Sequence, residues 1–136
     1  MPFRYSLLAV VIVLALHMFG VLYLYDIWHS YDMMMHFLGG ATMGLLALSI
    51  WDRYIKGVTF TVKHPWAKRI FFTFCIVGFT TVVGVAWEWY EFAFDMFLLP
   101  QLNGWSVSQP SVADTMADLF LDMAGAFTLS LLRMKV

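Results

Sequence analysis

Asp114-Thr-Met-Ala-Asp118-Leu-Phe-Leu-Asp122-Met-Ala-Gly125-Ala126 is the stretch that decides how this chain folds. It holds three aspartates, four residues apart, in a segment that is otherwise almost entirely apolar. Because an α-helix has 3.6 residues per turn, side chains four residues apart are offset by about 40° and share one helix face. The apolar residues continue to Leu132, so the segment is predicted to span a membrane with an acidic stripe on one side. A carboxylate at mid-membrane costs about 2.5–3.5 kcal/mol on an insertion scale, so each one needs a partner, a proton or a cation.

The composition indicates an integral membrane protein. Of the 136 residues, 62% are hydrophobic and 12% are charged, and a soluble domain of this size cannot bury that much apolar surface. The length suits one domain, so we expect residues 1–136 to form a single transmembrane unit. The only cysteine, Cys75, cannot form a disulfide within the chain. The net charge is −1, and we expect no nucleic-acid partner.

Four segments are long and apolar enough to cross a hydrocarbon core of about 30 Å. We therefore predict an all-α, integral membrane four-helix bundle with helices at approximately residues 6–24, 32–51, 70–94 and 114–132. A signal peptide is the alternative for the first segment, but its apolar part is too long and no small-residue cleavage site follows His17. Pro65 is expected to interrupt the chain in the loop before the third helix. Gly40 and Gly44 form a GxxxG motif that should let a neighbouring helix approach closely.

The basic residues give the predicted orientation, because the cytoplasmic flanks of membrane helices carry an excess of lysine and arginine. With four spans, the N-terminus, the middle loop and the C-terminus lie on the same side of the membrane. All eight basic residues fall in these three segments: Arg4, Arg53, Lys56, Lys63, Lys68, Arg69, Arg133 and Lys135. We therefore expect a multi-pass protein of the inner (cytoplasmic) membrane with both termini in the cytoplasm.

The acidic residues gather on the opposite side. Eight of the nine are predicted to lie in the outer half of the bilayer or the outer turns, and only Asp52 lies on the inner side. The spacing of Asp32 and His36, and of Glu88 and Glu91, puts each pair on one helix face. These faces should meet inside the bundle, where no lysine or arginine neutralises them. We predict a site for a divalent metal (Mg, Mn, Fe or Zn) whose ligands are Asp32, His36, Glu88, Glu91, Asp118 and Asp122.

These residues also have a purely structural interpretation. Asp32 and Asp114 could cap helix N-termini, where a negative charge is favourable. The deeper acids could stay protonated and hydrogen-bond to one another. His17, on the first helix, could complete the site. The run Met33–Met35 could suggest copper, but three consecutive side chains on a helix point in different directions.

The chain resembles a known family at these residues. The motifs that carry the resemblance are Tyr31-Asp32-x-x-x-His36-Phe37-x-Gly39-Gly40, Trp87-Glu88-x-x-Glu91 and Asp114-Thr115-x-x-Asp118-x-x-x-Asp122-x-x-Gly125-Ala126. Together they are similar to the VanZ-like and YjdF-type small membrane proteins, and they cover the second to fourth predicted helices. VanZ-like proteins often have a lysine after the first aspartate, where this chain has Met33. Because this chain lacks that possible counter-charge, we expect more strongly that its carboxylates bind a cation or share protons. The resemblance implies a polytopic membrane protein, with a link in some members to glycopeptide resistance at the cell envelope, and it implies no particular reaction.

Three classes of function fit these features. The first is metal-dependent chemistry on envelope lipids, in which the metal polarises a phosphoryl oxygen and Glu91 or Asp95 acts as the general base. The second is a carrier for protons or divalent cations, although the inner half of the membrane offers few polar groups for such a path. The third is a structural subunit of a larger membrane complex. The expected partners are membrane lipids, with a homo-oligomer or a larger membrane complex as alternatives.

Overall fold

The computed structural model describes residues 3–25, 27–28, 30–55, 64–102 and 106–133, and within these residues every regular element is helical. The four long helices are α1 (Phe3–Tyr23), α2 (Ser30–Ile50), α3 (Pro65–Phe97) and α4 (Val112–Arg133). A π-helical turn, η1 (Trp51–Ile55), continues α2, and a 3-10 turn, η2 (Leu99–Gln101), follows α3. All four long helices have the length and apolar composition needed to cross a membrane. The predicted all-α class with four membrane helices is therefore confirmed.

The third helix differs most from its prediction. α3 begins at Pro65 rather than near residue 70, and Pro65 occupies the first turn. Proline is favoured there because the first N–H groups of a helix have no intrahelical acceptor and the fixed φ angle suits the helix. The expectation that Pro65 interrupts the chain within a loop is therefore wrong, since this residue starts the helix. The 33 residues of α3 extend over about 50 Å, well beyond a hydrocarbon core of about 30 Å.

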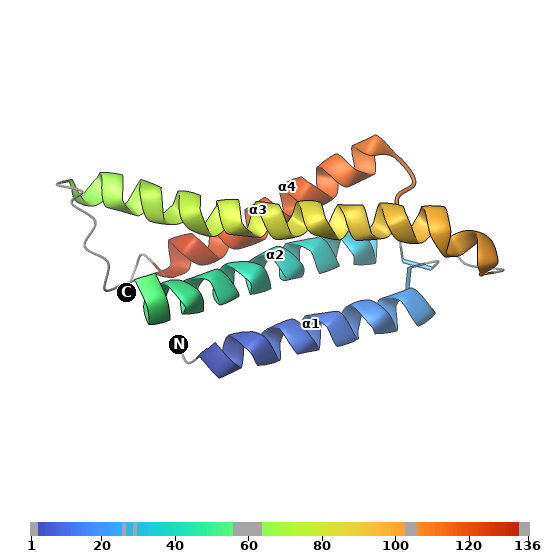
Figure 1. Ribbon diagram of the computed structural model, residues 1–136, viewed down its shortest axis with the longest axis horizontal. Helices are drawn as coiled ribbons and strands as arrows, with labels where there is room; N and C mark the ends of the chain where they lie inside the picture. Colours follow the sequence, from blue (N-terminus) through green and yellow to red (C-terminus); the bar gives the residue numbers. More distant parts are fainter. Residues whose placement is uncertain (1–2, 26, 29, 56–63, 103–105, 134–136) are drawn as a thin grey trace.

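Successive helices run in alternate directions, so the start of α1 and the end of α4 lie at the same end of the bundle (Figure 1). Two contacts join the elements at this end. The guanidinium of Arg53 lies 5.9 Å from the ring centroid of Phe3, and Arg133 Nη2 donates a hydrogen bond to Asp52 Oδ2 at 2.6 Å. The Arg133 side chain is 40% exposed, so this ion pair contributes at most about 1 kcal/mol. Since α3 also starts here, the described basic residues gather at one end of the bundle, which we call the basic end.

Glycines allow α2 and α4 to pack closely, and this contact is the most extensive in the bundle. A Cβ atom on Gly40 would overlap the backbone of Asp122. A Cβ atom on Gly44 would lie only 3.1 Å from Ala126 Cα. The GxxxG motif therefore has the predicted packing role. It also brings Asp122 of α4 beside the turn of α2 that carries His36.

The first helix is attached to the bundle mainly through α2. Tyr31 Oη donates a hydrogen bond to the carbonyl oxygen of Leu16 at 2.8 Å. The ring of Tyr31 lies against Gly20, where any side chain would overlap it. Among the described residues of α1, only Ser6 and Gly20 are buried. The other side chains of α1 are mostly apolar and exposed or half-buried, as expected for a helix that faces lipid.

A small apolar core lies in the half of the bundle nearer the basic end. Ala47 and Leu48 of α2 and Ile76 of α3 are buried, and Phe72 and Leu129 pack against them. These residues lie between the basic end and the polar residues described below. This half of the interior holds no buried carboxylate among the described residues, although Ser6, Ser49 and Ser130 are buried there.

Candidate metal centre

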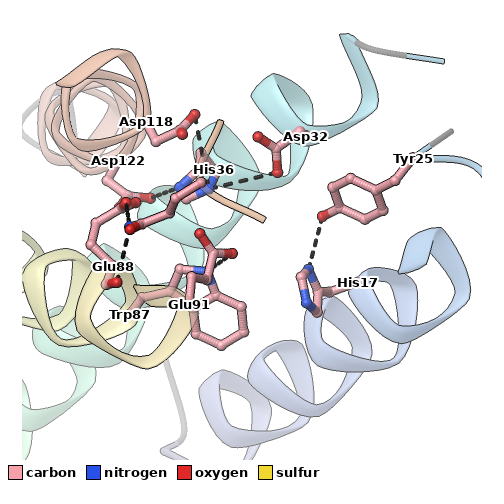
Figure 2. Close-up of polar contacts among 10 residues, drawn as sticks. His17, Tyr25, Asp32, His36, Trp87, Glu88, Glu91, Asp118 and Asp122 are labelled. Atoms are coloured by element: carbon pink, nitrogen blue, oxygen red, sulfur yellow. Dashed lines mark hydrogen bonds and ion pairs between the residues drawn. The ribbon is translucent and has the colours of Figure 1, made fainter. Parts of the chain in front are cut away.

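The six side chains predicted as ligands meet between three helices (Figure 2). They are Asp32 and His36 of α2, Glu88 and Glu91 of α3, and Asp118 and Asp122 of α4. All of them are buried except Asp32, which is partly exposed. The helical rise places His36 and Asp118 each about 9 Å from the first residue of its helix. The structure thus brings the predicted residues together at one depth, in the half of the bundle away from the basic end; we call this group the His36 cluster.

His36 lies at the centre of the cluster. Its Nε2 atom is 3.7 Å from Asp32 Oδ1 and 3.9 Å from Asp118 Oδ1. Its Nδ1 atom is 3.6 Å from Asp122 Oδ1. The two ring nitrogens therefore have different surroundings: Nε2 faces two carboxylates, and Nδ1 faces a third.

The side of the ring that carries Nε2 has the spacing of metal ligands. One ligand atom each from Asp32, His36 and Asp118 lie within 4.8 Å of one another. A tetrahedral ion with bonds of about 2.0–2.2 Å holds its ligand atoms about 3.3–3.6 Å apart, close to the two distances from Nε2. A metal-bound histidine commonly donates its other N–H to a carboxylate, and Asp122 is placed to accept from Nδ1. These three residues could therefore hold a metal ion.

Glu88 and Glu91 form a second group with His36, again with one ligand atom from each within 4.8 Å. Trp87 Nε1 donates a hydrogen bond to Glu91 Oε1 at 2.8 Å, and Gln109 Nε2 donates to Glu88 Oε2 at 2.6 Å. The other oxygen of Glu88, Oε1, is buried and has no hydrogen-bond partner within the described part of the chain. Leaving a buried acceptor unpaired is costly, and the cost is larger when the group is charged. A cation or a proton at this oxygen would remove the cost.

In the described part of the chain, no lysine or arginine pairs with the carboxylates of the cluster. Among the described residues, the one ion pair that involves a lysine or arginine joins Arg133 to Asp52, at the basic end. His36 can supply a single positive charge, and the carboxylates around it come from three helices. The cluster therefore has to hold several protons or a cation.

Gly84 of α3 leaves space for the side chain of Asp122. A Cβ atom at this position would lie 2.5 Å from Asp122 Oδ2 and 3.3 Å from Leu119. Gly39 of α2 lies near the other oxygen, with its Cβ position 3.9 Å from Asp122 Oδ1. The carboxylate of Asp122 therefore fits between two glycines, and a larger residue at position 84 would displace it.

Asp95, expected as a candidate general base, lies outside both ligand groups. Its Oδ1 and Oδ2 atoms accept hydrogen bonds from the backbone N–H groups of Ser108 and Gln109, at 3.0 and 2.9 Å. The side chain of Gln109 then donates to the carbonyl oxygen and to the carboxylate of Glu88. In this structure Asp95 fixes the loop that brings Gln109 to Glu88.

His17 lies beside the His36 cluster and is not part of either ligand group. Its Nδ1 atom is 2.8 Å from the hydroxyl oxygen of Tyr25, and its ring packs edge-on against Trp87 with 4.9 Å between centroids. Burial raises the pKa of Tyr25 above its ordinary value, and the carboxylates of Asp32 and Glu91 add to this shift. The Tyr25 hydroxyl therefore keeps its proton. His17 and Tyr25 form a polar pair between α1 and the cluster.

Two residues of the site, Gln109 and Gly84, are absent from the sequence-based prediction, and a third, Trp87, stands there only in the motif Trp87-Glu88-x-x-Glu91 and without a role. Gln109 is an uncharged loop residue, and no periodicity distinguishes it from its neighbours. In the helix that carries the two glutamates, Gly84 lies four residues before Glu88 and Trp87 lies four residues before Glu91. Their place on the face that carries the acids is the one pattern that could have indicated them.

Comparison with known proteins finds a family whose model matches this chain. Residues 3–136 match the model of a family described as predicted membrane protein (DUF2238). No curated protein and no solved structure matches the chain. The family match agrees with the membrane-protein class that the resemblance implied and does not support the VanZ-like or YjdF-type names in particular.

Proposed function

We propose that this chain, which belongs to the family of predicted membrane proteins DUF2238, binds a divalent metal ion in the His36 cluster and uses it for chemistry on a membrane lipid. The observation that carries the proposal is the convergence of Asp32, His36 and Asp118, which bring one ligand atom each to within 4.8 Å of one another next to the buried Glu88 and Glu91. No described lysine or arginine approaches these groups. A cation held by these three ligands would neutralise part of the surrounding carboxylate charge.

The ligand set that we favour is Asp32, His36 and Asp118, because its distances from Nε2 are close to those of a metal site. Asp122 would orient the imidazole of His36 by accepting a hydrogen bond from its Nδ1–H group. Glu88 and Glu91 share His36 with this set, so they supply an alternative position for the ion. One imidazole with several carboxylates suits Zn, Mn or Fe, whereas Mg prefers ligand sets made of oxygen alone.

The arrangement suits hydrolysis or group transfer more than electron transfer. Three protein ligands leave a position for water or for a substrate oxygen, and a bound ion of this kind lowers the pKa of coordinated water. Glu91 is buried and keeps one carboxylate oxygen outside its hydrogen bond to Trp87, so it is our candidate general base. Asp95 is assigned the positioning of Gln109 in this proposal, because both of its oxygens accept from loop N–H groups.

The orientation of the bundle is part of the proposal. The described basic residues lie at one end, and cytoplasmic flanks carry an excess of lysine and arginine. With the basic end in the cytoplasm, the His36 cluster lies in the outer half of an inner membrane. A substrate would then come from the outer leaflet, as expected for chemistry on envelope lipids.

Elemental analysis of protein purified in mild detergent without chelator tests the metal site. We expect near-stoichiometric divalent metal in the natural protein and a loss of most of it in His36→Phe and in Asp118→Asn, because each change removes one ligand. Matched control variants are His64→Phe and Asp52→Asn. His64 immediately precedes α3, and Asp52 pairs with Arg133, so both lie away from the cluster.

The identity of the metal would then separate the chemistries. Zinc or manganese would favour hydrolysis, and iron would favour an oxidative reaction. Well-folded natural protein without metal, after addition of each of these ions, would refute the proposal. An equal loss of metal in the controls and in the ligand variants would also count against a site at His36.

A further inference from the structure

A cleft lies between α1, α2 and α3 and runs into the His36 cluster. It has a volume of about 590 Å³, including the part that is open at the surface. The apolar walls include Val10 and Val13 of α1, Met43 of α2 and Val83 of α3. At the polar end the lining includes His17, Tyr25, His36 and Asp122. The cleft therefore joins an apolar channel to the residues of the candidate metal centre.

The position of the cleft along the helices shows where it opens. Val10 and His17 both line it, and seven residues of helix span about 10 Å. Val10 lies in the middle third of α1, and Thr80, another lining residue, lies near the middle of α3. The apolar end is thus at mid-bilayer and the polar end is at the depth of His36. With these helices spanning a bilayer, the open side of the cleft at this depth would face hydrocarbon.

The enclosed part of the cleft is too small to hold a helix. An α-helix has a diameter of about 10–12 Å with its side chains, so a length of about 10 Å fills roughly 800–1,100 Å³. The cleft has about 590 Å³ in all. A hydrocarbon chain is narrower, and a lipid chain is the molecule that surrounds the protein at this depth. One chain of a membrane amphiphile is therefore the occupant that the apolar walls and the surrounding lipid favour.

The polar end gives the chemistry of the head group. It contains imidazole, phenol and carboxylate groups and no lysine or arginine among the described lining residues. We infer that the cleft holds the hydrocarbon chain of an amphiphile that ends in an oxyanion, a carboxylate or a phosphate, and that this oxyanion binds the metal ion beside His36. The inference rests on the proposed metal site, because without a cation the carboxylates would repel such a head group. The open coordination position is where its oxygen would bind.

Fluorescence quenching can test this inference, because Trp87 lines the cleft. The protein would be placed in phosphatidylcholine nanodiscs that contain a small fraction of a dibrominated amphiphile. The probes are a fatty acid and a phosphatidic acid, with a dibrominated phosphatidylcholine as the neutral comparison. Subtracting the signal of Trp87→Phe isolates Trp87 from the other tryptophans. We expect both oxyanion probes, or one of them, to quench Trp87 several-fold more than phosphatidylcholine does, and the stronger probe identifies the carboxylate or the phosphate as the head group.

Two variants on α1 provide a matched comparison. Val13→Phe adds bulk inside the cleft, and Ile12→Phe adds the same bulk on a side chain that is 50% exposed and does not line the cleft. Val13→Phe should reduce quenching by the oxyanion probes several-fold, and Ile12→Phe should leave it unchanged. Equal quenching by oxyanion and phosphatidylcholine probes, or equal effects of the two variants, would overturn the inference.

Metal analysis of the same samples separates this inference from the proposed function. Metal-loaded protein that shows no preference for oxyanion probes would refute the inference and leave the metal site intact. Removal of the metal with a chelator should abolish the preference. A preference that survives full removal of the metal would refute metal-anchored binding of the head group. Protein that takes up no metal and shows no preference would refute the metal site and the inference together.

Discussion

Replacing Gly84 with alanine tests whether the placement of Asp122 controls metal binding. The added methyl group would lie 2.5 Å from Asp122 Oδ2, whereas ordinary contacts of a Cβ atom are 3.4–4 Å. The carboxylate therefore has to move by about 1 Å, which disturbs its 3.6 Å approach to His36 Nδ1. Losing the carboxylate partner of a metal-bound histidine typically costs about 10–100-fold in metal affinity. Overpacking should also destabilise the fold by about 1–3 kcal/mol.

The assay is metal affinity measured by competition with a chelator, together with thermal unfolding in the same detergent. Gly78→Ala is the matched control, because it is the same substitution in the same helix and its Cβ atom would meet nothing within 4 Å. An unhindered alanine should stabilise a helix by about 0.5–1 kcal/mol relative to glycine and leave the metal affinity unchanged. The reasoning would be wrong if Gly84→Ala bound metal as tightly as Gly78→Ala. It would also be wrong if both variants lost affinity to the same extent.

Three further predictions concern single polar groups. Asp122→Asn should lower metal affinity by about 10–100-fold without abolishing binding, in contrast to His36→Phe, and chelator competition distinguishes the two outcomes. Glu91→Gln should keep the metal and lower any turnover of a lipid substrate by about 10²–10⁴-fold, and equal turnover would exclude Glu91 as the general base. The raised pKa of Tyr25 makes the protonated form more stable in the folded protein, so stability from this group is fully present below its ordinary pKa of 10.0 and is lost as the pH rises further. The free energy of unfolding of the natural protein should therefore fall above pH 10 more steeply than that of Tyr25→Phe, by up to about 1.4 kcal/mol per pH unit, and parallel curves would contradict the assignment.

The sequence was sufficient to predict the helices and the convergence of the acids, for physical reasons that need no structure. A long apolar run with few charges has to form a helix in a bilayer, because every backbone group must be paired internally. The spacing of Asp118 and Asp122 puts two carboxylates on one face, and this face has to avoid lipid. The side of the helix that carries His36 also has to avoid lipid. In the structure these residues avoid lipid because they are buried together in one cluster.

Other features depend on contacts between distant segments, which no local pattern encodes. Asp95 is a residue type expected in such a site. In the structure, however, both of its carboxylate oxygens accept hydrogen bonds from the loop N–H groups of Ser108 and Gln109. The side chain of Gln109 reaches Glu88 only because that loop folds back on α3. Likewise, the different surroundings of the two nitrogens of His36 follow from the way α4 crosses α2 at the glycines. The cleft beside α1 is lined by residues from several helices, so no single stretch of sequence indicates it.

The position of the apolar core is a reason to prefer the proposed metal-dependent function to a carrier. On the side of the His36 cluster nearer the basic end, Thr80 Oγ1 and Ser49 Oγ are buried hydroxyl groups without hydrogen-bond partners in the described part of the chain. An ion that moved from the cluster toward the basic end could bind to them in turn. Between the cluster and the basic end, however, Leu48 and Ile76 are buried in the core with Ala47. A path for an ion would have to open that core, and an ion in an apolar environment is strongly disfavoured. The cleft, by contrast, reaches the cluster beside α1, which has the fewest described buried residues of the four long helices. Access from the side suits a lipid that brings its head group to a fixed metal ion, and it requires no movement of the packed contact between α2 and α4.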